Sequence, residues 1–375
     1  MNKLLKDGKL EIAPSVRTPS EDIFIREDAN VKDALKALDR CGKKVLIVVD
    51  DQKRMLGAIT DGDVRRHILK GHGLDDGIKK VYNKKAVFIK EQEFSMESVR
   101  KIMLKKQIEL VPIIDQSQKV VDYISWEKAF ADAGGERPVQ RQALGLPVVI
   151  MAGGKGTRLE PFSKIFPKPL IPVGEKPIVE IIIGEFKRQG INTFYLTLNY
   201  KGEMVKSYFD YVEKDYEIRY VWENDFLGTA SSLKLIDHMI EDVFIVSNCD
   251  VIVDADMREV LDYHKKQGAV LTVLSSIRHH KVPYGVVDFK EGGIINNIIE
   301  KPEYSFMINT GVYVMNKETL QLIPQKERYD MTDLIRDLIK NGQKVVTYPV
   351  NENAYIDVGQ WEEYKQAKER LKLLE

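Results

Sequence analysis

The hydrophobic pattern of the second half of the chain alternates between two kinds of segment. Short apolar runs, such as Val243–Ser247, are followed by amphipathic stretches, such as 255–267. A short apolar run between turn residues predicts a buried strand, whereas a 3.6-residue period predicts a helix. Strands and helices in alternation indicate an α/β fold with a mostly parallel sheet covered on both faces. The other expected strands are 193–198, 270–275, 285–289 and 311–315, and the other expected helices are 177–188 and 203–214.

Residues 1–130 have a different pattern, a weak internal repeat. The segment KKVLIVVD at 43–50 recurs as IELVPIID at 108–115. The segment GAITDGDVRR at 57–66 is weakly similar to DYISWEKAFA at 122–131. Each copy predicts a helix, two strands joined by a turn, and a second helix. The leading amphipathic helices are expected at 31–40 and 96–106. This half is therefore expected to be a smaller α+β domain built from two similar units.

A stretch without hydrophobic period joins the two halves. Residues 131–145, ADAGGERPVQRQALG, contain adjacent glycines and a proline, which is typical of a linker. The predicted domains are therefore 1–130 and 146–375, a division that suits a chain of 375 residues.

Composition excludes several classes of protein. Lys plus Arg and Asp plus Glu both number 57, so no net charge would direct the chain to nucleic acid or an anionic membrane. Its two cysteines, Cys41 and Cys249, provide no disulfide framework and fit a reducing compartment. The charged first ten residues and the absence of an eighteen-residue apolar segment predict a soluble cytoplasmic protein.

The most informative stretch is 146–174, LPVVIMAGGKGTRLEPFSKIFPKPLIPVG. An apolar run ending at Met151 and Ala152 opens into Gly153, Gly154 and Gly156, and Thr157 follows. Glycines let the backbone approach phosphate oxygens and point successive N–H groups at them. The stretch matches neither a P-loop nor a dinucleotide fingerprint. Four prolines between 161 and 172 are expected to keep the next dozen residues extended, so that Arg158 and Lys168 lie on a long loop.

GGKGTRLEP followed by FPKPLIPVG resembles the signature of the sugar-phosphate nucleotidyltransferases. This resemblance covers essentially all of 146–375. It implies a Rossmann-like (GT-A-like) mixed, mostly parallel sheet with a sugar-binding half. It also implies transfer of a nucleotidyl group from a nucleoside triphosphate to a sugar-1-phosphate, for which a protein mainly supplies positive charge and positioning.

The resemblance assigns roles to individual residues. Arg158 and Lys168 are the expected catalytic cations. Arg158 is expected to contact the leaving pyrophosphate, and Lys168 is expected to contact the α-phosphate. Asp250, after the strand VFIVSNC, and Asp357, in YIDVGQW, are the expected Mg²⁺ ligands. The family more often has Gly-Asp where this chain has Cys249-Asp250. The expected nucleotide-binding residues are Met151, Ala152, Gly153, Gly154, Gly156, Thr157, Glu223, Gly228 and Thr229, and the expected sugar-phosphate-binding residues are Tyr284, Gly285, Glu300, Lys301 and Asn309.

Glu223 carries the prediction about the base. It stands five residues before Gly228, where relatives that bind uracil or thymine tend to have an amide. An ionised carboxylate can accept from both N1–H and the N2 amino group of guanine, whereas a pyrimidine also requires a donor. GTP is therefore the expected nucleotide. The alternative is that Glu223 only faces solvent after a strand.

The repeat in residues 1–130 is similar to a tandem pair of CBS (cystathionine β-synthase) motifs, which bind adenosine nucleotides or mediate dimerisation. The first copy keeps the family's ribose-binding pattern as Thr60 and Asp63, whereas the second has Ser125 and then Lys128. An alternative is that Asp63 only stabilises the start of a helix. A homodimer formed through this domain is expected.

The domain order resembles that of the glucosamine-1-phosphate guanylyltransferases of bacterial legionaminic acid synthesis. GTP and glucosamine-1-phosphate are therefore the expected substrates. The alternatives are mannose- or heptose-1-phosphate guanylylation, and a non-catalytic regulatory subunit that senses a nucleotide or a sugar.

Overall fold

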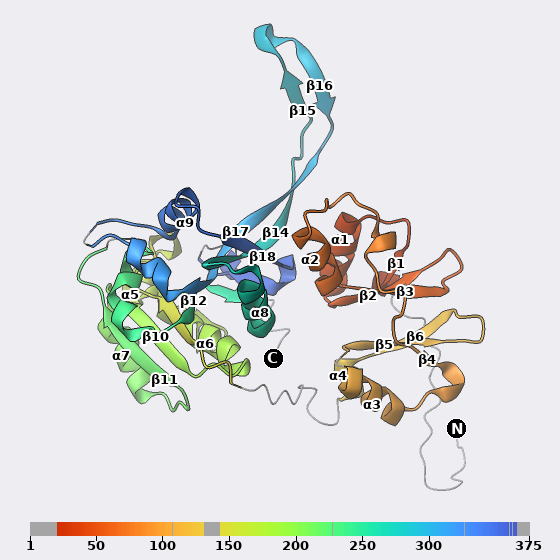
Figure 1. Ribbon diagram of the computed structural model, residues 1–375, viewed down its shortest axis with the longest axis horizontal. Helices are drawn as coiled ribbons and strands as arrows, with labels where there is room; N and C mark the ends of the chain where they lie inside the picture. Colours follow the sequence, from red (N-terminus) through yellow and green to blue (C-terminus); the bar gives the residue numbers. More distant parts are fainter. Residues whose placement is uncertain are drawn as a thin grey trace. The chain divides into compact units, whose positions relative to one another are not determined.

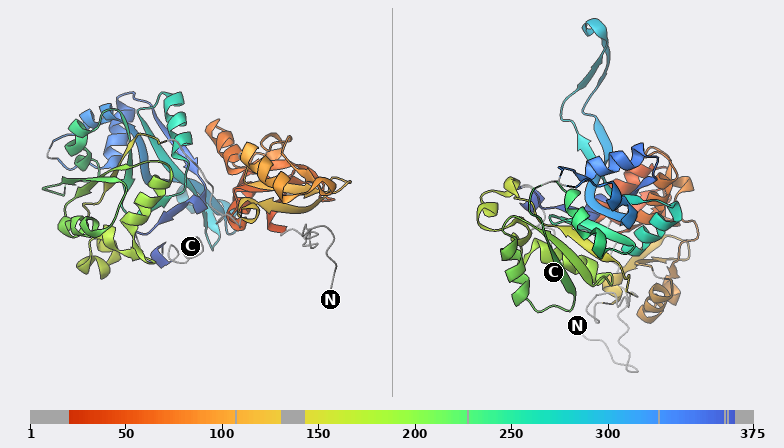
Figure 2. Two further views of the ribbon diagram at one scale, coloured as in Figure 1. Left: turned by 90° about the horizontal axis from the view of Figure 1, so that it is seen from below. Right: turned by 60° about the vertical axis from the view of Figure 1, so that its left-hand side comes forward.

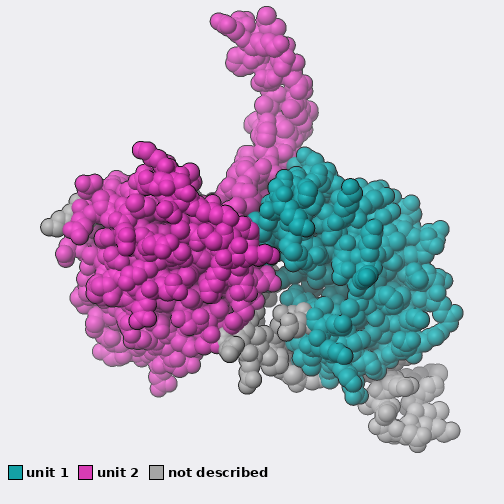
Figure 3. Space-filling model, viewed as in Figure 1, with its two compact units in different colours: residues 1–139 teal, residues 140–375 magenta. Residues whose placement is uncertain are grey.

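A computed structural model describes residues 21–106, 108–130, 143–226, 228–325, 327–359, 361 and 363–365 (Figure 1). The chain forms two compact units, residues 1–139 and 140–375 (Figure 3). Of the expected linker at 131–145, only the last three residues are described, so the linker prediction falls almost entirely outside the described residues.

The first unit contains two copies of one arrangement, as the internal repeat predicts. Each copy has a three-stranded sheet, ordered β1-β2-β3 in the first and β4-β5-β6 in the second. The expected helices at 31–40 and 96–106 are confirmed as α1 and α3. The first copy consists of η1 (Glu21–Ile23), β1 (Phe24–Arg26), α1 (Val31–Cys41), β2 (Val45–Val49), β3 (Met55–Thr60), α2 (Asp61–Leu69) and η2 (Ile78–Lys80), and the second of β4 (Ile89–Lys90), η3 (Glu91–Glu93), α3 (Met96–Lys106), β5 (Leu110–Ile114), β6 (Val120–Ser125) and α4 (Trp126–Ala129).

The second unit is built on a seven-stranded mixed sheet in the order β11-β10-β7-β12-β17-β14-β18 (Figures 1 and 2). The first four strands are parallel to one another, β18 is parallel to β14, and β17 is antiparallel to both its neighbours. The mostly parallel α/β fold expected from the sequence is therefore confirmed. The strands are β7 (Pro147–Met151), β10 (Thr193–Leu198), β11 (Glu217–Trp222), β12 (Val243–Asn248), β14 (Leu271–Lys281), β17 (Glu303–Asn316) and β18 (Val345–Val350).

Alternation along the strands separates two cores. In β7, Val148 and Ile150 belong to one buried cluster, and Val149 and Met151 belong to the other. The first cluster includes the apolar faces of α6 (Ile178–Arg188), α7 (Gly202–Tyr211) and α8 (Met257–Gln267). The second includes η7 (Ser231–Met239), η9 (Lys317–Leu322) and α9 (Met331–Lys340). The sheet is thus covered on both faces.

The expectation of an extended stretch after the glycine-rich loop was wrong. The segment folds into three short helical turns, η5 (Thr157–Leu159), α5 (Phe162–Ile165) and η6 (Lys168–Leu170). Proline fixes φ near −65°, which suits the first turn of a helix as well as an extended chain, and proline at the start of η6 is used in this way. Arg158 and Lys168 therefore lie on turns with defined backbone geometry.

Small strand pairs complete the unit. β8 (Pro172–Val173) pairs with β9 (Lys176–Pro177), and β13 (Val251–Val253) pairs with β19 (Tyr355–Asp357). β15 (Val286–Phe289) and β16 (Ile295–Ile299) form a two-stranded ribbon that projects from the sheet (Figure 1). The remaining short turns are η8 (Glu291–Gly293) and η10 (Glu352–Ala354). Among the described residues, none of the helices is long and apolar enough to cross a membrane.

Candidate active site

Four parallel strands of the second unit end at one edge of the sheet, and the candidate site is there. Met151 of β7 is level with Thr197 of β10 and with Asn248 of β12. Leu198 of β10 is level with Trp222 of β11. The residues after these strand ends are therefore brought together, as is usual for ligand sites of open α/β sheets.

The glycine-rich loop follows β7 and packs against Lys168. Ala152 N donates to Thr197 O at 3.0 Å, which fixes the start of the loop. Gly156 has φ 66°, and a β-carbon there would lie 2.9 Å from Lys168 Cβ, so a side chain at 156 is excluded both by conformation and by space. Gly154, Thr157 and Arg158 are exposed on the outside of the loop.

Lys168 forms an ion pair with Asp250 across 82 residues of sequence. Their side chains are only 17% and 14% exposed. Burial disfavours the Lys168 ammonium, but Asp250, Cys249 and Asp357 together outweigh burial and raise the pKa of Lys168. Lys168 is therefore held as a cation at the end of β12.

Pairing of β13 with β19 brings the two expected metal ligands together. Val251, the residue after Asp250, is paired with Asp357, and Val358 N donates to Asp250 O at 2.9 Å. Gly359 lies between the carboxylates: a β-carbon there would be 2.5 Å from Asp250 Oδ2 and 2.9 Å from Asp357 Oδ1. Two convergent carboxylates provide the oxygen ligands that Mg²⁺ takes.

Burial raises the pKa of Asp357, and the negative charge of Asp250 adds to the shift. The backbone N–H of Gly359, which donates to Asp357 Oδ1 at 2.6 Å, opposes it. The two carboxylates therefore form a site in which additional positive charge would be stabilised.

Glu223 follows β11 and lies against the glycine-rich loop. A β-carbon at Gly153 would be 2.7 Å from Glu223 Oε1, so the carboxylate occupies the space that a side chain would need. Asn199 Nδ2 donates to Glu223 O at 2.9 Å and ties the backbone of the two strand ends together. Burial raises the pKa of Glu223, and the nearby Thr197 hydroxyl opposes the shift. The alternative in which Glu223 only faces solvent is therefore wrong.

The expected nucleotide-binding turn at 228–229 is fixed to the start of α9. Gly228 has φ 102°, and a β-carbon there would be 2.7 Å from Tyr329 O. Thr229 N donates to Asp330 Oδ1 at 3.0 Å, and Met331 N donates to Thr229 Oγ1 at 2.9 Å. The turn and the helix therefore form one rigid substructure.

The expected sugar-phosphate residues are divided between the edge of the sheet and the ribbon. Asn309, in β17, donates to the Tyr313 hydroxyl at 2.7 Å and accepts from Gly311 N at 2.9 Å. Tyr284 and Gly285 directly precede β15, and Glu300 and Lys301 directly follow β16, so these four residues flank the base of the ribbon. Glu300 lies close to Gly285 and pairs with Lys301 at 4.0 Å. Among the described residues, none of these four has a hydrogen bond or ion pair with Lys168.

Three residues of the site were missed by sequence reasoning. Gly359 separates the carboxylates, Asn199 fixes the strand ends, and Asn248 packs where a side chain at Gly311 would otherwise lie. Gly359 had a signal, because a glycine two residues after an expected metal ligand indicates close approach. Asn199 directly follows β10 and Asn248 ends β12, and neither position had a signal in the sequence.

In the first unit, Thr60 and Asp63 form a capping box at the start of α2. Asp63 N donates to Thr60 Oγ1 at 3.1 Å, and Thr60 N donates to Asp63 Oδ2 at 2.9 Å. Asp63 Oδ1 also pairs with Arg66 at 2.6 Å. In the second copy, Ser125 makes no side-chain cap bond, and Lys128 pairs with Asp122 at 3.7 Å. Only the first copy has a carboxylate at this position.

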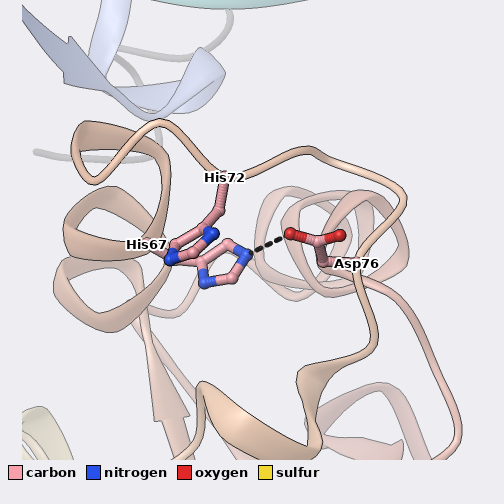
Figure 4. Close-up of side chains that lie close together, drawn as sticks. All are labelled: His67, His72 and Asp76. Atoms are coloured by element: carbon pink, nitrogen blue, oxygen red, sulfur yellow. Dashed lines mark hydrogen bonds and ion pairs between the residues drawn. The ribbon is translucent and has the colours of Figure 1, made fainter.

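A cleft of about 760 Å³ adjoins Asp63 and is lined by cations and carboxylates in equal number: Arg66, Lys70, Lys79 and Lys80, and Glu27, Asp28, Asp63 and Asp76. His67, His72 and Asp76 lie along the same cleft (Figure 4). His67 Nε2 is 3.0 Å from Asp76 Oδ2, and its ring stacks on His72 with centroids 4.5 Å apart. Gly73 N also donates to Asp76 Oδ2, so hydrogen bonds within the group already satisfy this carboxylate oxygen.

With this geometry in view, comparison with known proteins identifies the family. The Nucleotidyl transferase family model matches residues 147–372, which is more than half of the chain, so the chain belongs to this family. A CBS domain model matches residues 15–70, which include the first copy's capping box.

Individual relatives are similar over the same part of the chain. A UTP–glucose-1-phosphate uridylyltransferase of Synechocystis sp. is 30% identical over 59% of this chain and 62% of its own length. A mannose-1-phosphate guanyltransferase of Saccharomyces cerevisiae is 30% identical over 56% of this chain and 61% of its own. The chain thus spans about three fifths of the length of these curated relatives. Among solved structures, HddC from Yersinia pseudotuberculosis is 27% identical, covering 60% of this chain and 99% of its own, with a TM-score of 0.48.

Proposed function

We propose that the protein transfers GMP from GTP to a sugar-1-phosphate, with release of pyrophosphate. The observation that carries this proposal is the meeting of the glycine-rich loop, Lys168 and the Asp250–Asp357 pair at one edge of the sheet. Such a site combines backbone donors for phosphate, a buried cation and two convergent carboxylates. This set matches what nucleotidyl transfer requires, because the protein must mainly position and neutralise two polyanions.

In the proposed reaction, a phosphate oxygen of the sugar-1-phosphate attacks the α-phosphorus of the nucleotide. The bond from the α-phosphorus to the bridging oxygen breaks, and pyrophosphate leaves. Lys168 neutralises the α-phosphate and the incoming sugar phosphate. Arg158, exposed on η5, is free to meet the β- and γ-phosphates outside the loop. The backbone of the glycine-rich loop would approach the phosphates at Gly154, where a β-carbon would meet nothing within 4 Å.

Mg²⁺ fits the same site. Asp250 and Asp357 supply two oxygen ligands, and Gly359 leaves the space between them open. When bound, the ion would supply positive charge to the phosphate oxygens. The raised pKa of Asp357 supports this assignment, because it arises from burial and from the neighbouring Asp250 charge, and a bound cation would relieve both.

Glu223 supports GTP as the nucleotide. The named relatives include both guanylyl- and uridylyltransferases, so family membership leaves the base open. The carboxylate of Glu223 is partly buried beside Gly153 and close to the end of β7. An acceptor-only group there suits the paired donors of guanine.

For the acceptor we propose glucosamine-1-phosphate, on the resemblance in domain order noted above. Mannose- and heptose-1-phosphate are the alternatives. A non-catalytic regulatory subunit is disfavoured because Arg158, Lys168, Asp250 and Asp357 are all retained. The test is pyrophosphate release from the full chain with Mg²⁺, across GTP, UTP, dTTP, ATP and CTP and the three sugar-1-phosphates. No release with any pair would contradict the proposed function.

We also propose that the first CBS copy binds an adenosine nucleotide. Asp63 lines a cleft that has four carboxylates and four cations, so a ribose hydroxyl pair could be accepted by a carboxylate and phosphate groups could meet a neighbouring cation. Asp63 is at the same time part of the capping box, so the stabilising and ligand-binding roles are both compatible with its position.

A further inference from the structure

The ribbon formed by β15 and β16 exposes an unusual amount of apolar surface. Cross-strand pairing places Val287 opposite Ile298 and Phe289 opposite Ile295. These four side chains share one face, whereas the other face has the polar pair Asp288 and Asn297 and the apolar pair Val286 and Ile299. Phe289 is 66% exposed and Ile298 is 56% exposed. Exposed apolar side chains that cluster on a projecting ribbon indicate a surface that packs against another surface.

Two strands alone are marginally stable in water, so this ribbon needs a partner surface. Its base adds further exposed apolar side chains, including Tyr304, Phe306 and Met307. The stretch from 281 to 307 is comparable to the roughly 20–30 residues that one side of a stable interface contributes. Figure 3 shows the ribbon standing free of the globular body of its own unit.

The ribbon leaves the sheet at the same edge as the candidate active site. β17 pairs with β12 up to Val312 opposite Ser247, and its earlier residues extend beyond the end of β12. Glu303 to Asn309 are six steps of strand, which corresponds to about 20 Å. Lys301 therefore lies well beyond the edge at which Lys168 and Asp250 lie.

The base of the ribbon also directs it away from its own site. The ladder between β14 and β17 continues without a further shift from Ser275–Asn309 to Lys281–Glu303. Val282 N then donates to Pro302 O at 2.9 Å, which extends the pairing past the two strands. The two strands therefore stay paired as they pass the carboxyl end of β12.

We infer that the ribbon crosses to a second copy of this chain and completes that copy's active site with Glu300 and Lys301. This inference rests on the proposed function, in which these two residues contact the sugar phosphate. A closed two-fold pair in which each copy lends an identical element satisfies both ribbons at once. Each site is then made from the glycine-rich loop of one copy and the ribbon of the other.

The surface that would receive the ribbon lies next to the glycine-rich loop. Ile165, at the end of α5, is 65% exposed, and Phe166 is 43% exposed. Both follow Arg158 on the turns that lead to Lys168. An apolar ribbon face lying on these residues would bring Lys301 of the ribbon towards the phosphate-binding edge of the other copy.

Complementation between two inactive chains tests this inference. Two differently tagged full-length chains, one Lys168→Ala and one Lys301→Ala, are co-expressed, and heterodimers are isolated by successive affinity steps. If sites are shared, one of the two sites has both lysines, so pyrophosphate release per dimer should be half that of wild type. A heterodimer of Lys168→Ala with wild type is the control. It should release pyrophosphate at half the wild-type rate whether the sites are shared between chains or made within one chain.

Several outcomes would overturn the inference. Activity of the double-variant heterodimer at the level of the two inactive homodimers would show that each site is made within one chain. Failure of the tagged chains to copurify, or full activity of the Lys301→Ala homodimer, would equally overturn it. No pyrophosphate release by wild type would instead contradict the proposed function.

Crosslinking tests the ribbon independently of catalysis. A photoreactive benzophenone side chain at Phe289, on the apolar face, should yield covalent dimers joined to a peptide containing Ile165 and Phe166. The same group at Asn297, on the opposite face of the ribbon beside Asp288, should yield at least about tenfold less dimer. Mixing isotope-labelled with unlabelled chains separates the two possibilities: adducts within one chain only, or no adduct from Phe289, would overturn the inference.

Discussion

Glu223 lies directly against Gly153, although the two residues are 70 positions apart in the sequence. The register of β7, β10 and β11 makes them neighbours, and the absence of a side chain at 153 makes room for the carboxylate. The position of the base-reading group and the conformation of the phosphate loop are therefore coupled.

Gly153→Ala should damage nucleotide use. The added methyl group would lie 2.7 Å from Glu223 Oε1, so the carboxylate or the loop must move. A displacement of about 1 Å at an active site can lower the rate about a hundredfold. Steady-state kcat/KM for GTP measures it. Gly184→Ala is the control, because a β-carbon there meets nothing within 4 Å in α6, and this change should raise stability by about 0.5–1 kcal/mol without loss of activity.

Glu223→Gln should lower kcat/KM for GTP roughly 5- to 150-fold, which corresponds to a loss of about 1–3 kcal/mol in discrimination for guanine. The kcat/KM for UTP should be unchanged or higher. Because burial raises the pKa of Glu223, KM for GTP should increase as pH falls through that raised pKa, since the protonated carboxyl no longer accepts twice. Glu217→Gln, at the other end of β11, is the matched control. Equal losses with GTP and UTP would argue against a role in base selection.

Asp357→Asn should abolish turnover yet leave the metal-free protein at least as stable as wild type. A folded-state pKa raised by burial means that the charged carboxylate costs stability above that pKa, and the cost disappears as pH falls through it. In EDTA at neutral pH, the variant's Tm should therefore equal or exceed that of wild type, and the difference should shrink at lower pH. Added Mg²⁺ should raise Tm for wild type only. A Tm well below wild type in EDTA would contradict this account.

Asp63→Asn should separate the two roles of Asp63. Asparagine can still accept from Thr60 N and keep the capping box, but it loses the charge that would bind ribose hydroxyls. Titration calorimetry should show AMP or ATP binding weakened by about ten- to a hundredfold with little change in Tm. Thr60→Ala, which removes the cap, should instead cost about 1 kcal/mol of stability. If AMP or ATP bound Asp63→Asn with the same heat and affinity as wild type, Asp63 would only cap the helix.

The sequence predicted the parts of the fold that depend on local pattern. The helices at 31–40 and 96–106 and the strand at 243–247 follow from hydrophobic periodicity and agree with α1, α3 and β12. The expected strands at 270–275 and 311–315 correspond to the buried parts of β14 and β17 but miss their exposed extensions. The extension of β14 at 276–281 is mostly polar, and that of β17 at 303–310 alternates only over its first four residues, so hydrophobic periodicity does not mark either one as a strand.

The sequence predicted those site residues that belong to a recognisable motif. It did not predict the contacts that form only when strands distant in the sequence become neighbours. Lys168 and Asp250 came from separate motifs, but their ion pair depends on the packing of η6 against the end of β12. The contact of Glu223 with Gly153 depends on strand order, which sequence spacing does not determine. The capping box at Thr60 and Asp63 was visible as a pattern, and its dual interpretation arises because ribose binding and helix capping use the same residue types.

Pyrophosphate release by the wild-type protein and by Lys168→Ala, with Mg²⁺, GTP and glucosamine-1-phosphate, tests the central claim most directly. The account predicts that GTP supports a higher kcat/KM than UTP or dTTP. It also predicts that Lys168→Ala, which removes a buried cation paired with Asp250, lowers kcat by about a hundred- to a thousandfold. A higher kcat/KM with UTP or dTTP than with GTP would contradict the assigned nucleotide, and a Lys168→Ala variant that keeps more than about a tenth of wild-type turnover would contradict the assigned site.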